Sequence, residues 1–151
     1  YILPLVFLIV SSCGFKVENY SKLSNFAINN ISLSGDQRIN YKLKNGLLFK
    51  SNKNSEILLN LDFKTKKTKT IKEKNIKNEI TKYEIIINTR VKFRVIKTGL
   101  SGEFAIKKTG DYTVANQYSQ TLTNEKNLTK ILTNNIAEEI INELIIRINA
   151  I

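Results

Sequence analysis

The chain has 151 residues, of which 42% are hydrophobic, and it carries a net charge of +11, with no His and one Cys. This length suits a single domain, and the apolar fraction is too high for a disordered chain. A lone Cys excludes an internal disulfide, and the basic excess favours an anionic partner, although an AT-rich genome also encodes many Lys and Asn residues.

The first thirteen residues predict a bacterial lipoprotein signal. An apolar run over residues 1–10 ends in Val10-Ser11-Ser12-Cys13, which has the pattern of a lipobox. The run is shorter than the roughly 20 residues of a membrane span, so we expect residues 1–12 to be the remnant of a cleaved signal peptide. Cys13 would then carry the lipid anchor, and Gly14 after it favours the outer membrane. The alternative is that Cys13 is an ordinary buried thiol.

After the signal we expect a lipidated tether over residues 13–24 and one folded domain over residues 25–151. Residues 27–33 predict a short first strand, and Asp36 is a suitable N-cap for the helix that follows. This helix is expected to end near residue 51. Its apolar stripe recurs at a spacing of four and consists of Ile39, Leu43 and Leu47, with Tyr41 and Leu48 nearby.

Alternating apolar and polar residues predict three further strands. Residues 56–72 begin as an alternating strand and become strongly polar from Lys64, which fits a strand that projects beyond the core. Residues 83–95 give the clearest alternation, with one face apolar and the other polar. After a turn at residues 99–102, residues 103–114 alternate again, so these three strands predict an antiparallel meander.

The C-terminal segment predicts a long amphipathic helix, with Thr123, Asn124 and Glu125 providing its cap and an acid in its first turn. Its apolar stripe consists of Leu128, Ile131, Leu132, Ile136, Ile140, Ile141, Leu144, Ile145 and Ile148. Such a stripe can bind a membrane surface or a partner, but an apolar sheet face needs a cover, so we expect core packing. The predicted fold class is α+β: a single four-stranded, partly antiparallel sheet with two helices packed on one face, in the order β-α-β-β-β-α.

The sequence offers little to an enzyme, because it has no His and its only Cys is assigned to lipid. The acids lie among lysines or within strand alternation, without the spacing of a catalytic pair: Asp62, Glu73, Glu79, Glu84 and Glu103. Metal ligation lacks both His and free thiolates. Gly99 and Gly102 fit a turn better than a phosphate-binding loop. We therefore expect no catalysis, no cofactor and no metal site.

A basic tract is the best candidate for a binding surface, and we expect it to form a cationic tip on the hairpin between the second and third strands. The candidate residues are Lys64, Lys66, Lys67, Lys69, Lys72, Arg90, Lys92 and Arg94. Ammonium and guanidinium groups bind phosphates, so we predict contact with an anionic partner such as a phosphorylated lipid. The alternative is that the lysines only keep the hairpin soluble and protect its edge.

Several segments, from the lipobox to the last helix, match one known family in order and spacing. They are Cys13-Gly14-Phe15, residues 41–48, Tyr83-Glu84-Ile85, residues 102–118 and residues 143–148. In these segments the chain resembles LptE, the lipopolysaccharide-assembly lipoprotein. The resemblance implies a sheet with two helices on one face, anchored at the periplasmic side of the outer membrane. It also implies a non-catalytic plug inside the LptD β-barrel that helps its assembly and lipopolysaccharide export. With this resemblance, lipopolysaccharide becomes the expected anionic ligand of the basic tract. Val17 departs from the pattern, because related sequences often carry Pro there.

Two other classes of function stay open. One is another outer-membrane lipoprotein, such as a secretin pilot or a barrel-assembly accessory. The other is a nucleic-acid binder, which we do not expect because aromatic residues such as Phe93 fall on the apolar face, away from the basic side chains.

Overall fold

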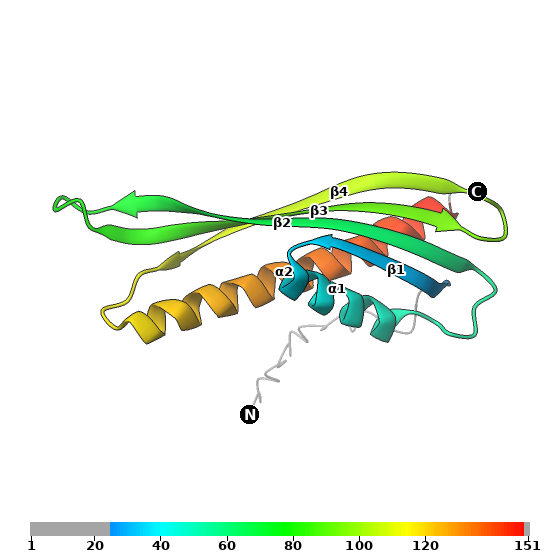
Figure 1. The fold of residues 1–151 in the computed structure, drawn as a ribbon, viewed down its shortest axis with the longest axis horizontal. Coiled ribbons are helices and arrows are strands. Elements are labelled where there is room, and N and C mark those ends of the chain that lie inside the picture. The colour runs from blue at the N-terminus through cyan, green and yellow to red at the C-terminus, as the bar shows by residue number, and fades with distance from the viewer. Residues whose placement is uncertain (1–24, 150–151) are drawn as a thin grey trace, which may run out of the picture.

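The computed structural model describes residues 25–149, which form one four-stranded sheet and two helices (Figure 1). In chain order the elements are β1 (Ala27–Gly35), α1 (Gln37–Lys50), β2 (Leu58–Lys74), β3 (Ile80–Val95), β4 (Ser101–Thr113) and α2 (Tyr118–Asn149). The α+β class and the order β-α-β-β-β-α are therefore confirmed. The predicted signal-peptide remnant, the tether and the lipidated Cys13 lie outside the described residues.

The strands lie side by side in sequence order, β1-β2-β3-β4. β1 and β2 run parallel, because α1 carries the chain back between them. Short turns join β2, β3 and β4, which pair antiparallel as the predicted meander. Figure 1 shows both helices on the same face of the sheet, as predicted. We call this face the helix side and the opposite face the open face.

The two halves of the molecule differ in how many strands and helices they contain. β2 and β3 have 17 and 16 residues, whereas β1 has nine. Figure 1 shows β1 and α1 along one half of the long axis, while the β2–β3 hairpin and the N-terminal part of α2 continue into the other half. The long strand that residues 56–72 predicted does project beyond the core.

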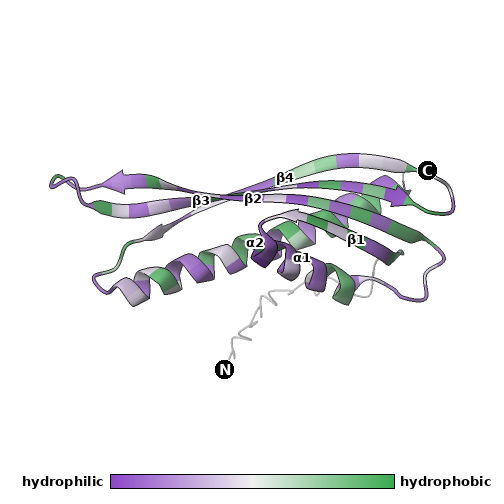
Figure 2. Ribbon diagram, in the orientation of Figure 1, coloured by the Kyte–Doolittle hydropathy of each residue, from purple (hydrophilic) through white to green (hydrophobic). Residues whose placement is uncertain are grey.

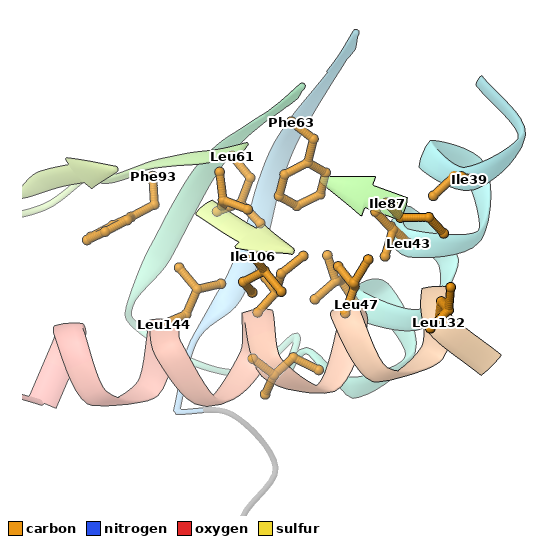
Figure 3. Packing of buried hydrophobic residues seen from close by; sticks show 14 of the residues in the cluster. Ile39, Leu43, Leu47, Leu61, Phe63, Ile87, Phe93, Ile106, Leu132 and Leu144 are labelled. Carbon is orange, nitrogen blue, oxygen red and sulfur yellow. The ribbon is translucent and has the colours of Figure 1, made fainter. Parts of the chain in front are cut away.

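The hydrophobic core fills the space between the helix side and the two helices (Figure 3). Leu43 of α1, Phe63 of β2 and Ile136 of α2 have no exposed surface. Each such side chain contributes about 1.5–3 kcal/mol when it leaves water. Figure 2 shows hydrophilic and hydrophobic residues alternating along β2 and β3, which explains why these strands are half buried. The stripe Ile39, Leu43 and Leu47 is buried as predicted.

The start of α2 differs from the prediction, because the helix begins at Tyr118 and not at the Thr123-Asn124-Glu125 sequence. Polar side chains of this sequence bond to backbone carbonyl groups, and the helix runs through them without interruption. The Thr123 hydroxyl donates to the Ser119 carbonyl at 3.0 Å, and the Asn124 amide donates to the Thr113 carbonyl at 3.0 Å. Of these residues, Thr123 therefore bonds within the helix, and Asn124 fastens the helix to the end of β4.

Four smaller predictions were also wrong. Ile131, Tyr41 and Leu48 are 56%, 66% and 37% exposed, so none of them belongs to the core stripe of its helix. Gly102 lies inside β4 and not in the turn. A Cβ at Gly102 would lie 2.7 Å from the Phe93 ring, so this glycine makes room for an aromatic side chain of the core.

Candidate anion-binding surface

The open face carries six of the eight predicted binding residues. Side chains on successive strand positions point to opposite faces, so the residues between the buried ones reach the open face. They are Lys64, Lys66 and Lys72 of β2 and Arg90, Lys92 and Arg94 of β3, all exposed. The strand alternation therefore gathers cations from two segments on one surface.

In the centre of this surface, basic side chains stand side by side on neighbouring strands. Lys64 pairs in register with Arg90, and Lys66 pairs with Asn88, which in turn pairs with Lys107 of β4. No acid stands in either cross-strand row. Within residues 25–149, Lys64, Lys66 and Lys107 form no ion pair with a carboxylate. We call Lys64, Lys66, Arg90 and Lys107 the basic centre.

Lys107 is a member of the basic centre that sequence reasoning missed. Its signal was present in the alternation of residues 103–114, because Phe104 and Ile106 are the apolar residues of this part of the strand and Lys107 follows on the other side. What the sequence could not provide is the register that sets Lys107 beside Asn88.

Ion pairs lie on both sides of the basic centre, and one of them includes its member Arg90. Arg90 and Lys92 lie 3.1 and 3.8 Å from the two oxygens of Glu103. Toward the hairpin, Lys72 lies 2.9 Å from Asp111 and 3.8 Å from Glu84. Exposed pairs of this kind contribute little to stability, so an incoming anion can compete for these cations.

A shallow hollow of about 590 Å³ adjoins the basic centre at the β3–β4 turn end of the open face. Its lining combines Lys92 and Arg94 with polar groups that can donate or accept hydrogen bonds, among them Asn60 and Ser101. Asp62 and Glu103 also line it. The hollow thus offers both cations and uncharged hydrogen-bonding groups to a ligand on this face.

Lys67 and Lys69 lie elsewhere, on the helix side. Lys67 donates to Glu125 Oε1 at 2.8 Å, and Lys69 donates to Glu125 Oε2 at 2.8 Å. The Tyr112 hydroxyl donates to the same Oε2 at 2.9 Å. The Lys69 ammonium also lies 4.2 Å from the centre of the Tyr83 ring, at cation–π distance. The structure therefore gives these two lysines an internal partner, and the basic tract divides between two faces.

The electrostatics of this group match its geometry. Burial raises the pKa of Glu125, but hydrogen bonds from Lys67, Lys69 and Tyr112 outweigh it and lower the pKa to about 2. The hydrogen bond with Glu125 raises the pKa of Lys69. Glu125, which the sequence suggested as a first-turn acid of α2, instead binds the helix to β2 and β4.

At the hairpin tip, nearby polar groups engage two of the lysines. Lys82 pairs with Glu73 at 2.7 Å, and the Lys74 ammonium donates to the Asn78 side chain at 2.9 Å. The cationic tip stays a prediction, while the cations without an acid in their cross-strand rows lie in the middle of β2, β3 and β4.

The fold is shared with solved lipoprotein structures. Rare lipoprotein B from Shewanella oneidensis aligns over 77% of this chain and 93% of its own, with a TM-score of 0.56 and 17% identity. Uncharacterized lipoprotein B from Nitrosomonas europaea aligns over 91% and 94%, with a TM-score of 0.62 and 13% identity. A third structure, from Caulobacter crescentus, has a TM-score of 0.61 at 14% identity over 87% and 95%.

Other comparisons gave no relatives: no family model matches the chain, and no curated protein matches it. Among the described residues, neither helix is long and apolar enough to cross a membrane.

Proposed function

We propose that the protein is a lipid-anchored, non-catalytic component of the outer membrane that acts as plug and assembly partner of an LptD-type β-barrel in lipopolysaccharide transport. The observation that carries this proposal is the β-α-β-β-β-α fold, shared over more than nine tenths of their length with proteins described as lipoproteins. The lipobox ending at Cys13 and the LptE-like segments support the same assignment.

The open face suggests how such a component meets its ligand. Phosphate groups of lipopolysaccharide are anions that ammonium and guanidinium groups bind through charge-assisted hydrogen bonds. The basic centre presents four such groups from three strands without an acid in the same rows. We therefore assign lipopolysaccharide binding to Lys64, Lys66, Arg90 and Lys107, with Lys92 and Arg94 at the border.

The partner is tested by purifying the protein from membranes with its neighbours attached. An LptD-type barrel in stoichiometric amount is the expected result. Recovery of a secretin, or of no barrel protein at all, would contradict the proposed partnership. Mass spectrometry of the same sample should find a lipid on the Cys13 sulfur.

The ligand site is tested with two matched quadruple variants. The first replaces the four residues of the basic centre by Gln, and the second replaces Lys42, Lys53, Lys126 and Lys130, exposed residues outside the open face. Both remove the same charge, so long-range attraction falls equally. We expect the first to lose lipopolysaccharide binding at least about tenfold and the second to change it little. An equal loss of lipopolysaccharide binding in both variants would show that the net charge attracts the ligand and that the basic centre is not a specific site.

A further inference from the structure

One edge of β2 has no neighbouring strand along its C-terminal half. β1 pairs with β2 only as far as Gly35, opposite Thr65. Gly35 has a φ of +89° and turns the chain toward α1, and the Asp36 N–H donates to the Thr65 carbonyl at 2.9 Å. Beyond this bond, residues 66–74 of β2 pair with β3 alone, and Figure 1 shows the strand continuing past the end of β1.

The backbone groups at this edge can be identified from the hydrogen bonds of their neighbours. In a strand, the N–H and C=O of one residue point to the same side, and the side alternates along the chain. The Thr65 carbonyl faces β1, since it binds Asp36. The N–H and C=O groups of Lys67, Lys69 and Ile71 therefore face the open edge, where no group of residues 25–149 bonds to them. Unpaired backbone N–H and C=O groups along a regular strand can pair with the backbone of another strand.

A groove of about 830 Å³ lies beside this edge on the helix side, between the first turns of α1 and the N-terminal half of α2, with Lys67 in its wall. Tyr41 and Leu122 give it apolar surface, and both are partly exposed. Its cations are Arg38, Lys42, Lys67, Lys126 and Lys130, against Asp36 and Glu125.

Both acids of the groove are already engaged. Asp36 accepts the Ile39 N–H as N-cap at 3.0 Å, and Glu125 is held by Lys67 and Lys69. The remaining cations give the groove a positive character.

The charge of the edge decides which strand it can accept. Residues 66–74 carry five lysines and one acid, Glu73. A second copy of the chain would therefore place mainly like charges opposite one another, which destabilises a strand pair. An acidic strand would instead gain from Lys66 on the open face and from Arg38 and Lys126 in the groove. We propose that residues 66–74 of β2 form a docking edge for an extended acidic segment of another protein, which continues the sheet beside β2 and places alternate side chains in the groove. The edge would bind such a segment whether or not the protein also enters a barrel.

The first test uses the full-length lipidated chain in detergent and an eight-residue peptide that alternates glutamate with valine. We expect saturable binding and slowed amide hydrogen exchange at Lys67, Lys69 and Ile71. A peptide with lysine in place of glutamate should not bind. Binding without protection of these three amides would overturn the proposal.

Two N-methylated forms of the peptide separate strand pairing from charge attraction. One carries methyl groups on the glutamate nitrogens and the other on the valine nitrogens. In a paired strand only every second backbone N–H of the peptide points toward β2. One methylated form should therefore lose at least about tenfold in affinity, whereas the other should bind nearly as well as the unmethylated peptide. Retention of affinity by both forms would overturn the proposal.

A proline pair tests the edge in the protein itself. Ile71 points its N–H outward, so Ile71→Pro removes an edge donor without removing a bond to β3. We expect a folded protein that has lost peptide binding about tenfold. Thr70→Pro is the control, because its N–H points toward β3 and its loss should lower the melting temperature. Unchanged peptide affinity of a folded Ile71→Pro variant would contradict docking at this edge.

Discussion

The Lys67 ammonium lies 2.8 Å from the Glu125 carboxylate, which joins β2 to α2 across 58 positions of sequence. Lys69 and Tyr112 bind the other oxygen of the same carboxylate. This group lies beyond the end of β1 and beside the first turns of α1, where α2 meets the long hairpin. Charge-assisted hydrogen bonds therefore fasten the N-terminal part of α2 to β2 and β4.

We predict that Glu125→Gln destabilises the protein by about 1–2 kcal/mol, because two ammonium groups and a phenol lose the charge they bind. The free energy of unfolding in urea measures this. Glu138→Gln is a matched control on the same helix, since Glu138 is more exposed and lies 3.8 Å from Lys50. A control effect as large as that of Glu125→Gln would mean that the loss reflects the charge of α2 in general.

The low pKa of Glu125 predicts a specific acid sensitivity. The pKa of Glu125 is lowered from 4.5 to about 2 in the folded chain. The stabilisation that ionised Glu125 provides is therefore complete above pH 4.5 and is lost as the pH falls toward 2. The difference in unfolding free energy between the wild type and Glu125→Gln should shrink over this window and stay constant from pH 6 to 8. A difference that persists at pH 2 would argue against an ionised Glu125 as its source.

The turn between β1 and α1 predicts a second sensitive position. A Cβ at Gly35 would lie 2.0 Å from the Thr65 carbonyl oxygen, and the φ of +89° is itself unfavourable for other residues. We expect Gly35→Ala to cost about 2–4 kcal/mol. Gly99→Ala separates the two causes, because Gly99 has a φ of +73° but nothing within 4 Å. Gly99→Ala should cost only about 1–2 kcal/mol of unfolding free energy. If thermal unfolding shows the same loss for both variants, a clash between the added methyl group at position 35 and Thr65 is not the cause.

Periodicity was sufficient to predict most of this fold. The spacing of Ile39, Leu43 and Leu47 identified the buried stripe of α1, and alternation around Val91 identified the buried face of β3. These patterns are local, and burial of one face enforces them. The start of α2 was missed because Thr123 and Asn124 resemble cap residues but do not cap the helix. Thr123 bonds to the Ser119 carbonyl, and Asn124 bonds to the Thr113 carbonyl.

The candidate surface was predicted only in part, because charge in a sequence does not state its face or its partner. Alternation alone separates Lys66 from Lys67. The sequence had no means to show that Glu125, 58 residues later, would bind Lys67. Nor could it show that Lys107 would stand in the same row as Lys66, since this depends on the register of three strands.

The contact between α1 and α2 predicts a stabilising substitution. Gly46 lies within α1, and a Cβ there would meet only the Ala137 Cβ, at 3.7 Å, which is ordinary van der Waals contact. The glycine therefore approaches α2 and not the sheet. Alanine in a helix is favoured over glycine by about 0.8–1 kcal/mol. Gly46→Ala should raise the melting temperature, and a lower melting temperature would show that the two helices cannot move apart enough for a methyl group.

The ion pairs beside the basic centre predict a variant that gains binding. Glu103 lies 3.1 Å from Arg90 and stands opposite Lys92 in the sheet. Glu103→Gln releases both cations and removes a negative charge from the open face. We expect affinity for lipopolysaccharide to rise about two- to fivefold at low salt, and the gain to shrink as salt screens exposed charges. Glu138→Gln changes the net charge equally on α2, outside the open face, and should leave the affinity near that of the wild type. If both variants gain equally, or if the Glu103 variant gains nothing at low salt, the ligand does not bind at this part of the open face.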